Sequence, residues 1–310
     1  MKRRDFLYKG AGVGLITGLG LSTKTFGENF DKLASSSSSL AGSYDLVAVK
    51  GGEPEVMFDK GIASLGGMSA FVKKGQTVVI KPNIGWDATP EKAANTNPKL
   101  IARIIEHCFK AGAKEVFVFD KTCDNWQKCY TNSGIEKAVK DAGGKIVTGN
   151  SEGMYKPVEI PKGKKLKNAK VHELILNSDV FINVPVLKNH GGAVLSISMK
   201  NLMGIVWDRG FWHKNDLHQC IADLPTWRKP DLNIVDAYRV MKRNGPRGVS
   251  VEDVEEVKAL LISKDIVAVD TAATKLFGLD PKTIGHITKA YEAGVGTMNL
   301  ESLKINRLTV

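Results

Sequence analysis

Short apolar runs alternate with longer segments of helical periodicity from Tyr44 onward. Runs rich in valine, isoleucine and phenylalanine predict strands, and apolar positions three and four residues apart predict helices. The predicted strands are 46–50, 77–81, 115–119, 145–148, 179–184, 233–236 and 258–262. The predicted helices are 54–65, 98–111, 133–142, 216–223, 266–277 and 283–293. This alternation favours an α/β fold, with a mainly parallel sheet and helices on both faces.

Polar side chains stand at the carboxyl ends of four predicted strands. They belong to Lys81 and Asn83, to Asp120, to Lys188 through His190, and to Asp236. The carboxyl ends of parallel strands share one edge, where open α/β sheets bind ligands, so we expect these side chains to meet in one crevice. The pattern predicts a site and its polarity, but it leaves the reaction open.

The segment from Phe181 to Gly204 holds the densest polar cluster. Its apolar strand runs into Lys188, Asn189 and His190, and a pair of glycines follows that would let a ligand approach the backbone closely. An imidazole can bind a metal ion or move protons near neutral pH. We expect the neighbouring lysine to lower the pKa of the histidine, because two positive charges repel each other.

The candidate residues fall into two groups. The candidates for catalysis are His190, Lys188, Asp120 and Asp236. The candidates for substrate binding are Lys81, Asn83, Lys200, Asn201 and Asp270. Lysine and amide side chains can hold carboxylates and phosphates. Asp270 lies in an apolar helix, and because a buried carboxylate needs polar partners, we expect it to face the crevice or a helix N-terminus. For Asn83 and Asp120 the alternative is a structural role as a turn cap.

A second polar group is interleaved with tryptophans after the first cluster. It consists of Asp208, Arg209, His213, His218 and Asp223. We expect His218, ahead of His213, to be a site residue and the ligand of a divalent metal ion if one is bound. The sequence lacks the H-E-x-x-H and H-x-H signatures of common metal sites, so the cofactor stays unknown.

Two of the four cysteines lie close together in the sequence. Cys123 and Cys129 are expected to form a disulfide in an oxidising compartment, with a role as two thiolate ligands as the alternative. The chain has no C-x-x-C spacing, and therefore no iron–sulfur motif of its own.

The composition indicates a soluble globular protein, with 43% hydrophobic and 25% charged residues. Its net charge is +11, and the first 41 residues carry six Lys and Arg against three Asp and Glu, so residues 42–310 keep +8. This surplus favours anionic ligands, and the absence of nucleic-acid-binding motifs argues against nucleic acid as a partner. The chain also lacks the G-x-G-x-x-G, P-loop and G-x-S-x-G motifs, which argues against dinucleotide, nucleotide triphosphate and serine-hydrolase sites.

The N-terminal residues predict export. Arg3 and Arg4 precede a short, glycine-rich apolar run, which is typical of a twin-arginine signal read by the twin-arginine export machinery. We therefore expect a periplasmic or exported protein, with signal and Ser-rich linker at 1–41 and no transmembrane domain in the mature chain. The remainder, 42–310, is expected to be a single α/β domain, or one with a C-terminal subdomain at 230–310. Disorder is expected near residues 22–42.

Several ordered motifs resemble one known family. They are IKPN (80–83), NVPVLKNH (183–190), MKNLMG (199–204), LHQCIADL (217–224), IVDA (234–237), NGP (244–246) and VDTAA (269–273). Together they resemble the family called domain of unknown function 362, over roughly residues 46–296. The resemblance implies an α/β fold and an association with iron–sulfur proteins, although this chain lacks the cluster module of some members. It implies no general reaction. In layout the chain is also faintly similar to nickel-pincer lactate racemases.

Two functions follow from these features. The first is an exported enzyme that acts on a small anionic substrate or cofactor at a crevice of Lys, His and Asp side chains, with a metal ion as an option. The alternative is a non-catalytic redox or cofactor-carrying partner of an iron–sulfur system, docking through a basic face. A deep cleft around His190 favours the enzyme, and a flat basic face favours docking.

Overall fold

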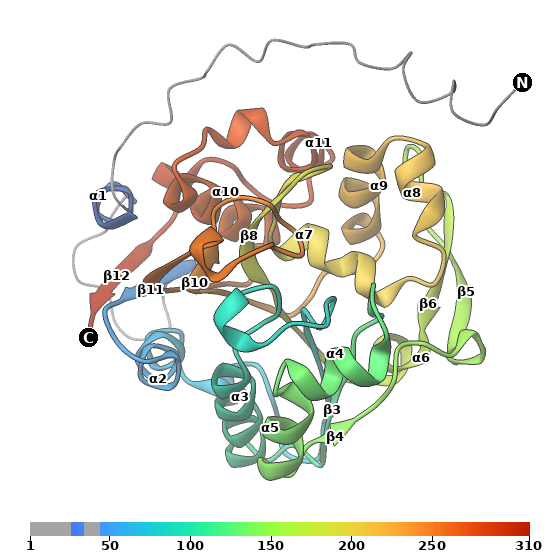
Figure 1. The fold of residues 1–310 in the computed structure, drawn as a ribbon, viewed down its shortest axis with the longest axis horizontal. Helices are drawn as coiled ribbons and strands as arrows, with labels where there is room; N and C mark the ends of the chain where they lie inside the picture. Colours follow the sequence, from blue (N-terminus) through green and yellow to red (C-terminus); the bar gives the residue numbers. More distant parts are fainter. Residues whose placement is uncertain (1–25, 34–43) are drawn as a thin grey trace, which may run out of the picture.

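Strands with buried side chains on both faces form the centre of the computed structural model, which describes residues 26–33 and 44–310 (Figure 1). The ten-stranded sheet has the order β12-β1-β11-β10-β7-β2-β3-β4, and β8 and β9 extend it beside β10. Its strands are β1 (Leu46–Lys50), β2 (Thr77–Pro82), β3 (Glu115–Val118), β4 (Lys145–Ile146), β7 (Val180–Val184), β8 (Val186–His190), β9 (Val194–Ser196), β10 (Leu232–Met241), β11 (Val254–Ser263) and β12 (Ile305–Thr309). A separate two-stranded sheet consists of β5 (Tyr155–Glu159) and β6 (Asn168–His172).

Most of the pairs in the large sheet are parallel. β2 pairs in parallel with β3 and β7, β3 with β4, β10 with β7 and β8, and β1 with β12. The antiparallel exceptions are β11, which pairs with β1 and β10, and the β8–β9 pair. The predicted α/β fold with a mainly parallel sheet is confirmed.

Helices cover both faces of the sheet, because alternate residues of each strand enter different cores. Val78 and Ile80 of β2 join one core, while Val79 joins the other. The first core is covered by α2 (Pro54–Ser64), α3 (Pro98–Lys110), α4 (Trp126–Asn132) and α5 (Ile135–Asp141). The second is covered by α6 (Glu173–Asn177), α7 (Ser198–Asn201), α8 (Gly210–Lys214), α9 (Leu217–Asp223), α10 (Ile266–Phe277) and α11 (Gly285–Glu292).

Each predicted strand and helix is present, but the segment after β7 differs from the prediction. Lys188, Asn189 and His190 were expected beyond the end of the strand predicted at 179–184, yet they lie in a second strand, β8, that follows β7 after Pro185. β8 pairs with β10 and β9, so its polar side chains belong to a hydrogen-bonded strand. Apolar periodicity could not reveal this strand, because Lys188 and His190 face a cavity and not the core.

A short helix, α1 (Phe26–Asp31), lies in the region where disorder was expected. Phe26, Phe30 and Leu33 are buried against the second core, and the Phe26 ring packs edge-on at 6.2 Å from that of Phe277. Arg3 and Arg4 lie outside the described residues, and so does the Ser-rich stretch. Among the described helices, none is long and apolar enough to cross a membrane.

Candidate functional site

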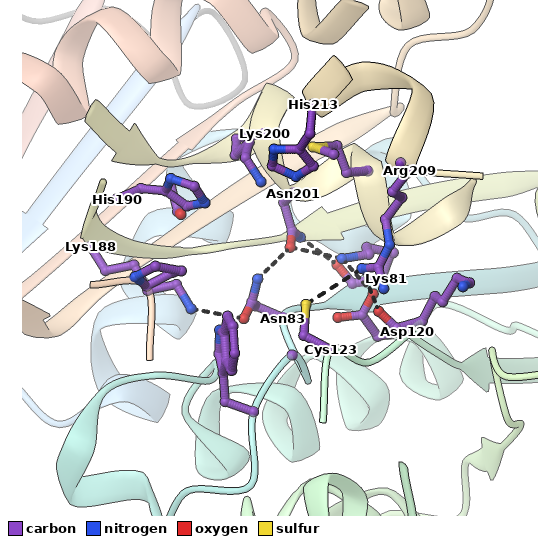
Figure 2. A pocket seen from close by; sticks show the side chains of 18 of the residues that line it. Lys81, Asn83, Asp120, Cys123, Lys188, His190, Lys200, Asn201, Arg209 and His213 are labelled. Atoms are coloured by element: carbon purple, nitrogen blue, oxygen red, sulfur yellow. Dashed lines mark hydrogen bonds and ion pairs between the residues drawn. The ribbon is translucent and has the colours of Figure 1, made fainter. Parts of the chain in front are cut away.

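A cavity of about 600 Å³ opens at the carboxyl edge of the sheet, where β2, β3, β8 and α7 meet (Figure 2). Of the ten residues predicted to form the site, seven line it: Lys81, Asn83, Asp120, Lys188, His190, Lys200 and Asn201. They come from four separate stretches of the chain, which the parallel strands bring to one edge. The cavity has the shape of a cleft and not of a flat basic face.

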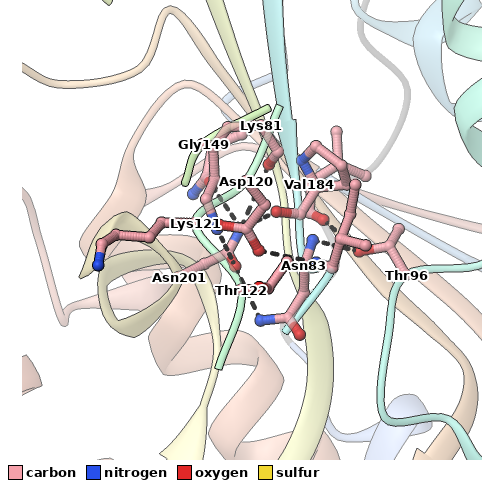
Figure 3. A network of polar contacts seen from close by, with 12 residues as sticks. Lys81, Asn83, Thr96, Asp120, Lys121, Thr122, Gly149, Val184 and Asn201 are labelled. Carbon is pink, nitrogen blue, oxygen red and sulfur yellow. Dashed lines mark hydrogen bonds and ion pairs between the residues drawn. The ribbon is translucent and has the colours of Figure 1, made fainter. Parts of the chain in front are cut away.

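Lys81 and Asp120 form a buried ion pair in the wall of the cavity. Lys81 Nζ lies 2.9 Å from Asp120 Oδ1 and donates a hydrogen bond to Asn201 Oδ1 at 2.7 Å (Figure 3). Asp120 Oδ2 accepts the backbone N–H of Ile84 at 2.7 Å. Burial lowers the pKa of Lys81, and the Asp120 carboxylate opposes that effect. Both charges are therefore fixed by protein partners, and the pair holds the ends of β2 and β3 together.

Gly204 leaves the space that this ion pair occupies. A Cβ atom at position 204 would lie 2.6 Å from both Cε and Nζ of Lys81 and would overlap Asp120 Oδ1. Only glycine allows this close approach of backbone to ion pair.

Asn201 joins the carboxyl ends of the strands through its amide. Its Nδ2 donates to Asn183 Oδ1 at 2.9 Å and to the Lys81 carbonyl at 3.2 Å, and its Oδ1 accepts from Asn83 Nδ2 at 3.0 Å. Asn83 Oδ1 in turn accepts a hydrogen bond from Lys188 Nζ at 3.1 Å. These amides orient the lysines, so their positions are set before any ligand enters.

The ring of His190 is held as a neutral tautomer. Its Nδ1 accepts the backbone N–H groups of Gly192 and Ala193, both at 3.0 Å, which leaves the proton on Nε2. Among the described residues, Nε2 has no hydrogen-bond partner. Burial, together with the charges of Lys200 and Lys188, lowers the pKa of His190 to about 3. The expected effect of the lysine on the histidine is confirmed.

Two lysines of the cavity titrate near neutral pH. Burial lowers the pKa of Lys188 to about 7, and it lowers that of Lys200 to about 8. Lys188 also donates to the backbone carbonyl of Ala94, whereas Lys200 has no hydrogen bond or ion pair with any described residue. Of these two lysines, Lys200 is therefore the one whose ammonium group is available to a ligand.

Other residues of the cavity were not predicted as a group. Arg209 donates to the carbonyls of Lys121 and Thr122 at 3.0 and 2.7 Å, and Lys121 Nζ lies 3.9 Å over the ring of Trp207. Cys123 and His213 also line the cavity. Arg209 and His213 were noted in the sequence as members of the second polar group. Nothing in the sequence showed that both side chains lie beside Lys200 and Lys81 in the same cavity (Figure 2).

Asp236 does not line the cavity. Its buried carboxylate accepts the backbone N–H of Asn97 at 2.7 Å and that of Tyr238 at 3.0 Å, so it joins β10 to the start of α3. Burial raises its pKa to about 6. The prediction placed Asp236 at the correct strand, but the side chain turns to neighbouring backbone and is not a proton-transfer group facing a ligand.

Asp270 and His218 also lie away from the cavity. Asp270 accepts hydrogen bonds from the backbone N–H groups of Ser198 and Met199, at 2.8 and 3.0 Å. These groups form the N-terminus of α7, so Asp270 lies in one of its two expected environments. His218 faces His286, with their Nδ1 atoms 3.2 Å apart. Thus His213, not His218, is the histidine of the second group in the cavity. No three His, Cys, Asp or Glu side chains of the described residues are grouped to hold a metal ion.

The expected disulfide between Cys123 and Cys129 is not formed. Both thiols are free; Cys129 is buried in α4 while Cys123 is exposed to the cavity. Their spacing of six residues crosses the start of α4, which turns the two side chains to different surroundings.

Comparisons with known proteins bear on this chain as a whole. The family described as domain of unknown function (DUF362) matches residues 78–275. The thylakoid-associated protein sll1697 of Synechocystis sp. is 28% identical over 228 residues, which cover 71% of this chain and 68% of that protein. The lactate racemase apoprotein of Thermoanaerobacterium thermosaccharolyticum superposes with a TM-score of 0.43 at 12% identity, over 72% of this chain. The matched part spans 55% of the racemase chain.

Proposed function

Because this chain belongs to the DUF362 family, a family without an assigned function, we propose its function from the cavity: it binds a small carboxylate or phosphate ester and exchanges a proton with it. The match to the family model confirms the membership that the ordered motifs predicted. The proposed reaction rests only on the chemistry of the residues in the cavity.

The charge balance of the cavity carries this proposal. Its lining holds five cationic side chains, from Lys81, Lys121, Lys188, Lys200 and Arg209, against the two carboxylates of Asp120 and Asp208. Asp120 is already paired with Lys81. Excess positive charge in a cavity attracts anions. The Lys200 ammonium, which has no partner among the described residues, can pair with such an anion.

Proton exchange is assigned to the lysines with lowered pKa. A group whose pKa lies near the ambient pH can both give and take a proton efficiently. Lys188, with a pKa of about 7, meets this condition, and Lys200, with a pKa of about 8, holds the anion beside it. His190 stays neutral and offers its Nε2 proton as a hydrogen-bond donor.

Thermal unfolding in the presence of small anions tests the proposal. We expect oxalate, glyoxylate or phosphate to raise the Tm of the wild type in a concentration-dependent way, because a ligand of the folded state stabilises it. Lys200→Met should abolish most of this shift, as it removes the available ammonium group while keeping the length of the side chain.

Lys162→Met is the matched control. Lys162 is exposed on a turn outside the cavity, so the variant changes the net charge equally and should keep the shift. Equal anion-induced shifts in Tm for the two variants would mean that anion binding depends only on the net charge of the protein, and the proposed site would be wrong.

We also propose that the protein is exported through its Arg3-Arg4 signal. Replacing both arginines by lysine should retain the protein in the cytoplasm, as measured by cell fractionation. Unchanged export of this variant would contradict the proposal.

A further inference from the structure

Cys123 differs from the other cysteines of the chain in its environment. Cys108, Cys129 and Cys220 are each 0% exposed, and burial raises their pKa to about 12, 12 and 11. Cys123 is exposed and lines the cavity. Buried thiols of this kind are inert, whereas accessible thiols among positive charges are the reactive ones.

Positive groups surround the Cys123 sulfur. Arg209 Nη1 lies 3.7 Å from the Cys123 Sγ. The loop that carries Cys123 is fixed by a hydrogen bond from its backbone N–H to the Gly85 carbonyl, at 2.8 Å. Lys81, Lys121, Lys188 and Lys200 each interact electrostatically with this sulfur. Cys123 thus has the accessible, positively charged surroundings in which reactive cysteines occur.

A second feature of the same cavity indicates a ligand with a developing negative charge. His190 is only 9% exposed, yet its Nε2–H has no partner among the described residues. A donor left open on the wall of a cavity is satisfied when a ligand oxygen accepts from it. Together with the Lys200 ammonium, it would stabilise an oxyanion.

We infer that Cys123 is the reactive thiol of this cavity and adds to the carbonyl carbon of a small oxo acid whose carboxylate the cationic lining holds. The inference rests on the proposed anion binding. In the step, the thiol proton passes to the Lys188 amine, the Sγ–C bond forms, and the carbonyl π pair moves to the oxygen, beside the Lys200 ammonium. The oxygen then takes the proton back from Lys188, which yields a hemithioacetal without a leaving group or an oxidant.

Alkylation of the full-length protein, followed by intact-mass spectrometry, tests the thiol. Cys123 should react about tenfold faster with iodoacetate than with neutral iodoacetamide, because the cationic cavity concentrates anions. In each reaction the Sγ–C bond forms as iodide leaves with the electron pair of the C–I bond. A reference thiol, from Lys162→Cys in a Cys123→Ser background, should show no such preference, and Lys200→Met should reduce it at Cys123.

Protection by two matched acids tests the covalent step. Glyoxylate should slow the alkylation of Cys123 by iodoacetamide several times more than glycolate, which has the carboxylate but an alcohol in place of the carbonyl. Equal protection by the two would overturn the addition step, while the anion binding would stand.

The alkylation rates separate the remaining outcomes. If Cys123 reacts no faster than the reference thiol with either reagent, the inference fails, and the thermal shifts with Lys200→Met still decide the proposed function. If Cys123 reacts rapidly with both reagents and shows no preference for iodoacetate, the inference fails together with the proposed anion binding.

Discussion

Lys200 shows at the scale of one residue how burial changes the chemistry of a side chain. Its stem is enclosed by the cavity wall, and this burial is the main reason why its pKa falls to about 8. The network of Asn83, Asn201 and the Lys81–Asp120 pair is complete without it. A lysine with such an environment changes charge within a range of pH that experiments reach easily.

The affinity for oxalate should depend on pH through Lys200. Only the ammonium form attracts the anion, so the Kd should rise by up to about tenfold per pH unit above pH 8, after a smaller rise near pH 7 from Lys188. Oxalate keeps its charge over this range, and calorimetric titration from pH 6 to pH 9.5 would measure the effect.

Lys200→Met is the control for this pH dependence, since it should remove the rise near pH 8 and leave only the contribution of Lys188, whose pKa is about 7. A wild-type Kd that does not change between pH 7 and pH 9.5 would rule out Lys200 as the anion-binding group.

At the scale of elements, the four-residue helix α7 carries both Lys200 and Asn201 into the cavity. So short a helix has no stability of its own. Its first N–H groups are bound by Asp270, a residue of α10, and Asn183 Nδ2 donates to the carbonyl of Ser198 at 3.0 Å. Asp270 thus supports the site from outside it, which explains a carboxylate in an apolar helix.

Asp270→Ala should lower the free energy of unfolding by about 1–3 kcal/mol, because two buried N–H groups lose their acceptor. It should also weaken anion binding, since Lys200 and Asn201 would no longer be held in place. Urea denaturation and the oxalate-induced shift in Tm would measure the two effects.

Asp280→Ala is the matched control at this scale. Asp280 caps an exposed turn by accepting the N–H of Lys282, so its loss should cost at most about 1 kcal/mol and should leave the oxalate shift unchanged. If Asp270→Ala affects stability but not anion binding, the supporting role of Asp270 is wrong.

At the scale of the whole molecule, α1 fastens an N-terminal segment to the second core. Phe26, Phe30 and Leu33 bury their side chains there, and Lys50 Nζ lies 2.8 Å from Asp31 Oδ1 at the surface. The exposed ion pair adds little, so apolar burial accounts for the attachment. A chain cleaved after residue 41, at the end of the predicted signal and linker, would lack this helix.

A chain that begins at residue 42 should be less stable than one that begins at residue 22. We expect a loss of about 1–3 kcal/mol, because the burial of three large apolar side chains exceeds the cost of ordering a short segment. Urea denaturation of the two chains would measure it. Phe30→Ala in the longer chain should reproduce much of the loss, and equal stability of the two chains would contradict the packing of α1.

The sequence by itself determined the elements and the edge of the sheet that carries the site. Apolar runs such as Val78 to Ile80 are buried in the folded protein, so their spacing in the sequence identifies the strands. Because neighbouring strands are parallel, the polar residues that follow them, such as Lys81, Asp120 and Lys188, lie at one edge of the sheet.

Only the tertiary structure decided which polar side chains face the cavity. Asp236 follows the same sequence rule as Asp120, and Asp270 was expected at the crevice or at a helix N-terminus. Both carboxylates instead accept hydrogen bonds from nearby backbone N–H groups, which turn them away from the ligand space. Cys123 and Arg209 enter the cavity because a loop and α8 fold against it. The hydrogen-bond partners of these side chains come from segments that are distant in the sequence and meet only in the folded chain. The pattern of residues along the sequence therefore does not reveal them.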